Sequence, residues 1–425
     1  MDKEKTDALY LGLDLCDDLC QVSWFDAQTL DAETFYFDAE GTQPFLPTVL
    51  CRGREGEVWY IGEDAYKMAL TGKGTLVDEL VKLTVRGGTS TIGGRRYEAE
   101  ELLEIYLNKL LLTVMDARGT REIAQVVITL QELSAPLVES VVRVMGHLGI
   151  GRDRLTLISH TEAFVYYVLT QKKELWANQA VLFDLTRNGL HYYEMSVLRG
   201  RTPQMVKAAH EFLEEGFRLD ILETKSGRKL ADTILQNCAE RLLDRKVISS
   251  VFLTGKGFEK TDWAGEFLKT LCRKRRVFAG QGLFAKGAAY IALDHDREAS
   301  AYSISCLCEG RIPVTVTMDA AVKGRERQLI LASAGTSWFE AGTSLEMIRG
   351  SANELELTVR RVDPAGIRKV IIPLAALPDR PERMTRIAVS LAFLREDYME
   401  VKIRDLGFGE WYSATGTEIK EYFTV

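Results

Sequence analysis

Apolar residues in the first 170 positions of the chain form short runs that predict alternating strands and helices. Continuous apolar runs of four to eight residues are typical of buried strands, and apolar residues every three or four positions are typical of amphipathic helices. The segment 98–117 has a wide apolar stripe, which predicts a long helix packed on a sheet. We expect strands at 10–15, 21–25, 33–38, 44–50, 58–61, 124–129 and 155–158, and helices at 63–70, 98–117, 134–149 and through 162 to 169.

A compressed form of the same order follows in residues 180–293. Both occurrences begin with a hairpin whose first strand ends at an aspartate, Asp14 in one and Asp184 in the other. The repeat predicts a duplicated α/β fold, with a first lobe over 1–175, a second lobe over 176–296 and a cleft between them. In the second lobe we expect strands at 180–185, 190–195 and 250–254, and helices across 205–245, at 261–272 and at 284–293.

The pattern changes near residue 296, after which apolar and polar residues alternate and no helix is expected before the last residues. Period-two alternation predicts strands with one buried face, and seven or eight such strands predict a β-sandwich over 297–425. Trp338 and Phe339 lie beside a loop of this domain, where they either form an exposed peptide-docking surface or are buried in the sandwich. The expected strands are 302–308, 314–318, 328–332, 354–359, 369–372, 386–392 and 399–403.

Composition and charge narrow the class of protein. The 425-residue chain carries a net charge of −7, which argues against a nucleic-acid partner, because binding to a polyanion needs clustered cations. No apolar stretch approaches the length of a membrane span, so no membrane partner is expected. The charged first residues lack the apolar core of a signal peptide. We therefore expect a cytoplasmic protein of two or three domains.

The seven cysteines do not predict a disulfide framework, because their number is odd and they are dispersed. Cys16 and Cys20 flank the first turn, and Cys306 and Cys308 lie in a strand pattern. Neither pair has a matching second pair or nearby histidines at zinc spacing, so the cysteines do not predict a metal site. Reduced thiols are the expectation.

Six segments carry a resemblance when they are taken in order. They are the first hairpin with Asp14, Val-Val-Ile-Thr at 126–129, Val-Leu-Phe-Asp-Leu at 181–185, Val-Phe-Leu-Thr-Gly-Lys-Gly at 251–257, Leu-Phe-Ala-Lys-Gly-Ala-Ala-Tyr at 283–290, and the strands over 371–378, 386–391 and 401–407. The ordered set resembles the DnaK-type, seventy-kilodalton heat-shock chaperones of the superfamily of actin, sugar kinases and heat-shock ATPases. The resemblance covers nearly the whole chain, which looks like a divergent and shortened member.

The resemblance implies an actin-like ATPase fold of duplicated ribonuclease-H-like lobes, with a shortened outer subdomain in the second lobe. It implies a following sandwich similar to the chaperones' substrate-binding β-domain, without a helical lid. ATP or ADP with Mg²⁺ is the implied cofactor, and binding of no nucleotide is the alternative. Asp14 and Asp184 are either the implied magnesium ligands or inherited residues that only cap the ends of buried strands. The candidate catalytic residues are Asp14, Lys82, Glu162 (with His160 as its alternative) and Asp184. The implied cofactor-binding residues are Asp14, Asp184, Gly189, Gly255, Gly257 and Gly287.

The turns that follow the two aspartates depart from the family pattern. Small residues in a phosphate-binding turn let backbone N–H groups approach the anion. The family's Gly-Thr-Thr is here Cys16-Asp17-Asp18, and its Gly-Gly-Gly-Thr is here Thr186-Arg187-Asn188-Gly189. Each added carboxylate opposes a phosphate by about 1–4 kcal/mol per close charge pair. The departures leave ATPase activity open, and the sequence does not decide whether the chain is an enzyme.

Several residues near these turns have two interpretations. Asp17 and Asp18 form either a new metal site or a solvated acidic turn. Arg187 is either a phosphate ligand or a surface arginine, and His191, at the position of a family aspartate, is interpreted as a structural histidine.

Three functions follow from these expectations. The preferred one is a DnaK-like pseudo-ATPase that acts through protein or peptide binding. The alternatives are an active ATP-dependent chaperone with altered phosphate-binding turns, and an actin-like scaffold that assembles with itself. The oligomeric state is left open.

Overall fold

The structure is a computed structural model, and it describes residues 8–55, 58–198, 204–297, 300 and 304–425. The chain forms two compact units, residues 1–304 and residues 305–425. Within the described ranges, no helix combines the length and the apolar character needed to cross a membrane.

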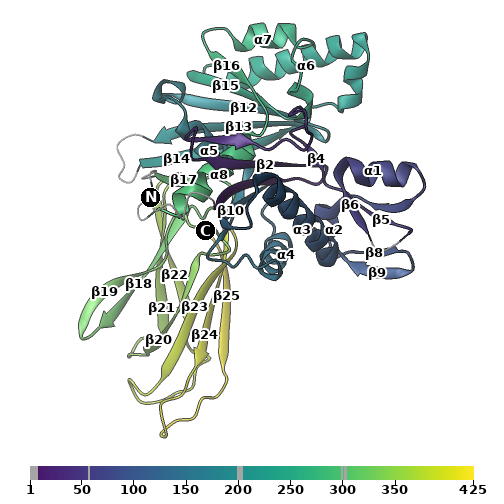
Figure 1. Ribbon diagram of the computed structural model, residues 1–425. Helices are drawn as coiled ribbons and strands as arrows, with labels where there is room; N and C mark the ends of the chain where they lie inside the picture. Colours follow the sequence, from purple (N-terminus) through teal and green to yellow (C-terminus); the bar gives the residue numbers. More distant parts are fainter. Residues whose placement is uncertain (1–7, 56–57, 199–203, 298–299, 301–303) are drawn as a thin grey trace. The chain divides into compact units, whose positions relative to one another are not determined.

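The first sheet of the first unit has the strand order β11-β10-β1-β2-β3, with β4 paired to β2 (Figure 1). Strand β1 runs antiparallel to β2 and parallel to β10. Consecutive residues are buried in both strands, Leu13 with Asp14 in β1 and Val127 with Ile128 in β10, as expected of strands that are covered on both faces. The strands are β1 (Leu9–Leu15), β2 (Leu19–Asp26), β3 (Asp31–Thr34), β4 (Leu46–Pro47), β10 (Ile123–Leu130) and β11 (Leu155–Ser159).

The second sheet repeats this arrangement in the order β16-β15-β12-β13-β14. Strand β12 takes the place of β1, because it runs antiparallel to β13 and parallel to β15. The two segments that share the hydrophobic pattern therefore fold into two sheets whose strands follow the same order. The strands are β12 (Gln179–Thr186), β13 (Gly189–Leu198), β14 (Gln204–Leu213), β15 (Ile248–Thr254) and β16 (Arg276–Ala279).

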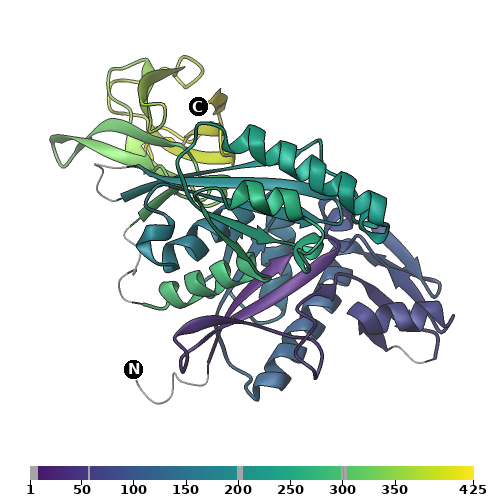
Figure 2. The same ribbon diagram turned by 90° about the horizontal axis from the view of Figure 1, so that it is seen from above.

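Helices cover the two sheets of the first unit. Helices α6 and α7 share a buried core with β12 and β15, and Figure 2 shows the long teal helix α6 lying along the second sheet. The helices are α1 (Gly62–Leu70), α2 (Leu80–Val85), α3 (Ala99–Arg118), α4 (Ala135–His147), α5 (His160–Thr170), α6 (Lys225–Leu243), α7 (Gly265–Leu271) and α8 (Leu283–His295), with short 3-10 helices η2 (Lys173–Leu175), η3 (Leu219–Glu223) and η4 (Lys256–Phe258).

Two small sheets complete the first unit beside α1, α2 and α3 (Figure 1). One has the strand order β6-β5-β7, and the other is the hairpin β8-β9. Their strands are β5 (Leu50–Gly53), β6 (Trp59–Ile61), β7 (Gly74–Val77), β8 (Thr89–Ile92) and β9 (Arg95–Glu98).

Helix α8 follows the second sheet in the chain but packs on strands β1, β2 and β10 of the first sheet. Helix α5, from the first half, packs on α8 and also contacts β13 and β14. The close approach requires glycines: a Cβ on Gly12 would lie 1.9 Å from the carbonyl oxygen of Ala285, and a Cβ on Gly287 would lie 2.0 Å from that of Ala163. The two halves of the first unit are thus joined through exchanged helices.

The second unit contains two four-stranded antiparallel sheets, with orders β19-β18-β21-β22 and β20-β23-β24-β25. Alternate residues such as Val314, Val316, Val389 and Leu391 are buried. Trp338 is also buried. Strand β17 (Ile304–Leu307) spans the boundary between the units; the others are β18 (Val314–Val322), β19 (Arg325–Ala332), β20 (Gly342–Ile348), β21 (Glu354–Arg361), β22 (Gly366–Pro373), β23 (Arg386–Arg395), β24 (Tyr398–Asp405) and β25 (Glu418–Thr424).

Some expected elements were wrong. The beginning of the helical region expected across 205–245 is strand β14, because residues with helical propensity here pair with the whole length of β13, and pairing overrides propensity. Strand β20 was not expected, since it begins with Gly342, Thr343 and Ser344, a composition typical of loops. The last residues form strand β25 rather than a helix. The expected strand at 302–308 begins at positions outside the described residues.

Candidate functional site

The two predicted aspartates lie in the same place in their sheets and line one small cavity. Asp14 is in β1 and Asp184 is in β12, and both are buried. This inner cavity has a volume of about 40 Å³. The other residues around it are Cys16, Asp18, Leu19, Gln21, Phe45, His160, Thr186, Thr254, Gly255, Lys256 and Phe284.

His160 brings an imidazole to the first of these aspartates. Its Nε2 lies 2.8 Å from Oδ1 of Asp14, and Sγ of Cys16 lies 3.5 Å from the same oxygen and 3.7 Å from Nε2. The imidazole stacks on the ring of Phe284 at a centroid distance of 4.1 Å. Three different metal-ligating atoms are therefore gathered at one end of the inner cavity.

The electrostatics of the inner cavity oppose further negative charge. Burial raises the pKa of Asp184 to about 7; the charge of His160 lowers it, and the carboxylates of Asp14 and Asp18 raise it. Burial, with the nearby carboxylates, also raises the pKa of the Cys16 thiol well above its usual value. A cation is favoured here over an anion.

The glycine turn after β15 packs on Asp184 directly. Gly255 has φ +90°, and a Cβ there would lie 2.3 Å from Oδ1 of Asp184 and 2.6 Å from the carbonyl oxygen of Leu185. A Cβ on Gly257 would lie 2.4 Å from Cδ2 of Leu185. Protein packing alone therefore requires both glycines.

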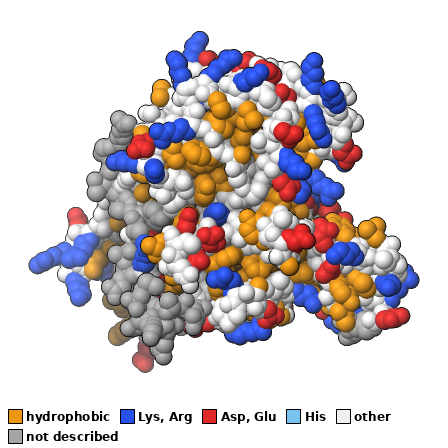
Figure 3. All heavy atoms as spheres, turned by 45° about the horizontal axis from the view of Figure 1, so that its top comes forward, with side chains coloured by type: hydrophobic (Ala, Val, Ile, Leu, Met, Phe, Trp, Pro, Cys, Tyr) orange, Lys and Arg blue, Asp and Glu red, His pale blue; other side chains and the backbone are white. Residues whose placement is uncertain are grey.

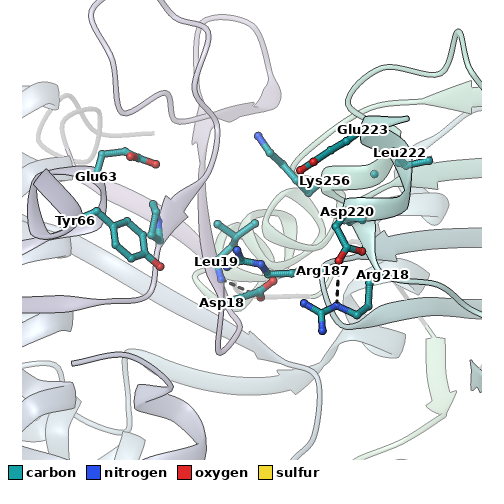
Figure 4. A pocket seen from close by; sticks show the side chains of 13 residues that line it. Asp18, Leu19, Glu63, Tyr66, Arg187, Arg218, Asp220, Leu222, Glu223 and Lys256 are labelled. Atoms are coloured by element: carbon teal, nitrogen blue, oxygen red, sulfur yellow. Dashed lines mark hydrogen bonds and ion pairs between the residues drawn. The ribbon is translucent and has the colours of Figure 1, made fainter. Parts of the chain in front are cut away.

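A larger outer pocket, of about 650 Å³, shares Asp18, Leu19 and Lys256 with the inner cavity. Figure 4 shows Glu63 and Tyr66 of α1 on one side, facing residues of the second half on the other. The second half contributes Arg187, Arg218, Leu219, Asp220, Leu222, Glu223, Lys256 and Gly257, and Pro47 completes the lining.

The charges of the outer pocket are largely balanced. Lys256 pairs with Glu259 at 2.7 Å and lies over the ring of Phe45, and Arg218 lies 3.7 Å from Asp220. Arg187 is exposed. On the coloured surface in Figure 3, basic and acidic side chains are likewise interspersed. The outer pocket is thus mixed in charge rather than a basic cradle for phosphate.

Lys82, the candidate catalytic lysine, lies outside the residues that line either cavity. Its Nζ lies 3.1 Å from Asp17 and 2.8 Å from Glu79, and its backbone N–H donates to Asp17. Asp17 is therefore held in an ion pair with Lys82. Of the two carboxylates in this turn, Asp18 lines the inner cavity and Asp17 does not.

The other predicted site residues also lie outside the linings. Glu162 is buried in the first turn of α5, where its N–H donates to the Ser159 hydroxyl. Gly189 is the first residue of β13, where an added Cβ would meet the ring of Phe212, and Gly287 lies at the α5–α8 contact. His191 stacks on His210 and contacts Gln131.

The cluster of Asp14, Cys16 and His160 was missed at the level of sequence. The histidine is 144 residues from the cysteine, so no local spacing connects them. The resemblance did give one indication of this cluster, because it aligned His160 with a family glutamate that lies near the position of Asp14.

Two family models match the chain, and neither describes a function. A family of unknown function (DUF5716), C-terminal, matches residues 31–309, and a domain of unknown function (DUF8552) matches residues 311–425. Their junction lies close to the boundary between the two compact units. No curated protein matches the chain.

Proposed function

The chain belongs to the family of unknown function DUF5716, and we propose that it is a DnaK-like pseudo-ATPase that acts through protein or peptide binding. The common strand order of its two sheets supports an actin-like fold with ribonuclease-H-like lobes. The paired four-stranded sheets of the second unit support a β-sandwich similar to a substrate-binding domain. Seven free cysteines support a reducing compartment, the cytoplasm.

The small volume and the acidic lining of the inner cavity are the main evidence for a pseudo-ATPase, a protein that does not turn over ATP. Ligand pockets usually enclose about 300–1,000 Å³, whereas the cavity that contains Asp14 and Asp184 encloses about 40 Å³. Its acidic lining repels phosphate. Asp184 and Leu185 take up the space next to Gly255 and Gly257, so no phosphate can approach the backbone of this turn. The outer pocket has the volume of a ligand site, but neither Asp14 nor Asp184 lines it.

An edge strand of the second unit supports the peptide-binding part of the proposal. Strand β22 is at the end of its sheet, and Ile367 and Ile371 of this strand are more than half exposed. Exposed edge strands with apolar side chains pair readily with an extended segment of another chain. We propose an extended apolar peptide as the occupant of this edge.

The first experiment combines calorimetric titration of the full chain with ATP and Mg²⁺ and a phosphate-release assay. We expect no turnover, and any weak nucleotide binding should be unchanged in Asp14→Ala. Turnover that vanishes in Asp14→Ala would instead establish the active chaperone. Light scattering that reports self-assembly independent of salt would favour the actin-like scaffold.

The second experiment measures fluorescence anisotropy of a labelled, extended apolar peptide with the full chain. Replacing Ile367 and Ile371 together by glutamate should weaken binding at least about tenfold, because two charges would face the peptide. Ile330→Glu, on the opposite edge strand β19, is the matched control and should leave the affinity unchanged. Equal effects of both changes would contradict binding at β22.

A further inference from the structure

The side chains of Asp14 in β1, Cys16 in the turn after it and His160 at the start of α5 converge on one end of the inner cavity. Their ligand atoms all lie within 4.8 Å of one another. We propose that these three residues form a binding site for one divalent transition-metal ion of borderline softness, represented by Zn²⁺. The site is independent of the proposed peptide binding, which involves the second unit.

The distances between the three atoms are close to those of a tetrahedral metal centre. Bonds of about 2.0–2.3 Å from zinc to nitrogen, oxygen and sulfur place the ligand atoms about 3.3–3.6 Å apart. The sulfur of Cys16 lies 3.5 Å from Oδ1 of Asp14 and 3.7 Å from Nε2 of His160. Only the 2.8 Å separation of Oδ1 and Nε2 must open, by about half an ångström, when the ion replaces their hydrogen bond.

The backbone around each ligand is fixed before an ion binds. Asp14 is held in β1 between β2 and β10, and the N–H of Cys16 donates to the carbonyl of Leu19 across the turn. His160 is the first residue of α5, which Ser159 caps. The stacked ring of Phe284 fixes the plane of the imidazole. A binding site requires ligands that are held in this way by packing and by the surrounding backbone.

The inner cavity leaves a fourth coordination position open. Its volume of about 40 Å³ exceeds the roughly 10–15 Å³ of free space that one water molecule requires. The Nε2 of buried Gln21 borders this space and has no hydrogen-bond partner among the described residues. A water on the ion would accept a hydrogen bond from this amide. Three protein ligands and one water form the usual arrangement of an open zinc site.

The choice of metal follows from the donor set. Thiolate and imidazole favour zinc and cobalt, whereas Mg²⁺ selects oxygen ligands with octahedral geometry. On binding, one metal–sulfur, one metal–nitrogen and one metal–oxygen bond form. The thiol proton of Cys16, and the proton from Nε2 of His160 where it is present, pass to the buffer.

The test is a titration of the full chain, first treated with chelator, with Co²⁺. We expect one ion per chain and a thiolate-to-cobalt charge-transfer absorption that Zn²⁺ abolishes and a thousandfold excess of Mg²⁺ leaves unchanged. Cys16→Ser should remove the absorption, and the exposed Cys272→Ser is the matched control that should retain it. Absence of the absorption, its persistence in Cys16→Ser, or displacement by Mg²⁺ would overturn the site.

Alkylation of the unaltered chain gives a readout that does not depend on the folding of a variant. Zn²⁺ should slow the modification of Cys16 at least about tenfold, because a metal-bound thiolate is no longer a free nucleophile. The rate at Cys272 should not change. Equal rates at Cys16 with and without Zn²⁺ would contradict the proposal, whatever the outcome of the ATP and peptide experiments.

Discussion

At the scale of single residues, Arg380 and Asp405 form a buried ion pair in the second unit. Their side chains are 4% and 0% exposed, and two parallel hydrogen bonds of 2.8 and 2.9 Å join them. The N–H groups of Gly407 and Thr415 and the Thr415 hydroxyl also donate to the carboxylate. Burial alone would raise the pKa of Asp405, but these hydrogen bonds outweigh it and hold the pKa well below its usual range.

We expect Asp405→Asn to lower the free energy of unfolding of the second unit by about 3 kcal/mol at pH 7, because it leaves Arg380 buried without its charge partner. The stabilisation by Asp405 is present above the unfolded pKa of about 3.9 and is lost as the pH falls through the lower folded pKa. The difference between the two proteins should therefore shrink below about pH 4. Denaturant unfolding at pH 3 to 7 measures it.

The matched control for this prediction is Asp397→Asn. Asp397 lies 3.3 Å from Arg395, but both side chains are more than half exposed. An exposed pair contributes about 0–1 kcal/mol, so this change should have little effect. A difference for Asp405→Asn that is the same at pH 3 and pH 7 would contradict the assigned direction of its pKa.

At the scale of elements, the contact between α5 and α8 depends on the absence of a side chain at Gly287. A Cβ there would meet the backbone of Ala163, which cannot move as a flexible side chain can. The resemblance assigns Gly287 to a nucleotide site, whereas its position in the fold assigns it to helix packing.

Gly287→Ala should therefore destabilise the first unit by about 1–3 kcal/mol, the usual effect of overpacking. Gly146→Ala is the matched control: this glycine lies in α4, and no atom lies within 4 Å of an added Cβ. The control should be neutral or stabilise by up to about 1 kcal/mol through helix propensity. The free energy of unfolding measures both, and equal values for the two variants would refute the packing role.

At the scale of the whole molecule, each compact unit has its own buried core. Differential scanning calorimetry of the full chain should therefore resolve two transitions. Asp405→Asn should lower the midpoint of one by about 10 °C, and Gly287→Ala should lower only the other. A single transition that both variants shift equally would show that the two cores unfold together.

The sequence predicted those parts of the fold that local patterns determine. Strands such as β1, β10, β12 and β15 are continuous apolar runs, and the strand-ending aspartates Asp14 and Asp184 were correctly placed in them. Strand β14 was missed because its pairing with β13, and not its own composition, determines its conformation.

The site was less predictable than the strands. The approach of His160 to Cys16 depends on how β1 and α5 meet in space, which no spacing in the sequence encodes. The sequence identified the glycines that match the family motifs. Whether such a glycine faces a ligand or the backbone of another segment depends on its tertiary contacts, which the sequence does not show.

The exchanged position of α8 has a consequence for how the chain is made. Strand β1 leaves the ribosome long before residues 283–295 are synthesised, and these residues form α8, the helix that packs on β1. Until then the apolar face around Gly12 has no cover from α8, and partly folded chains with uncovered apolar faces are prone to aggregate. The first sheet can therefore mature only after the second has been synthesised, and a nascent chain of this family is expected to need protection for most of its translation.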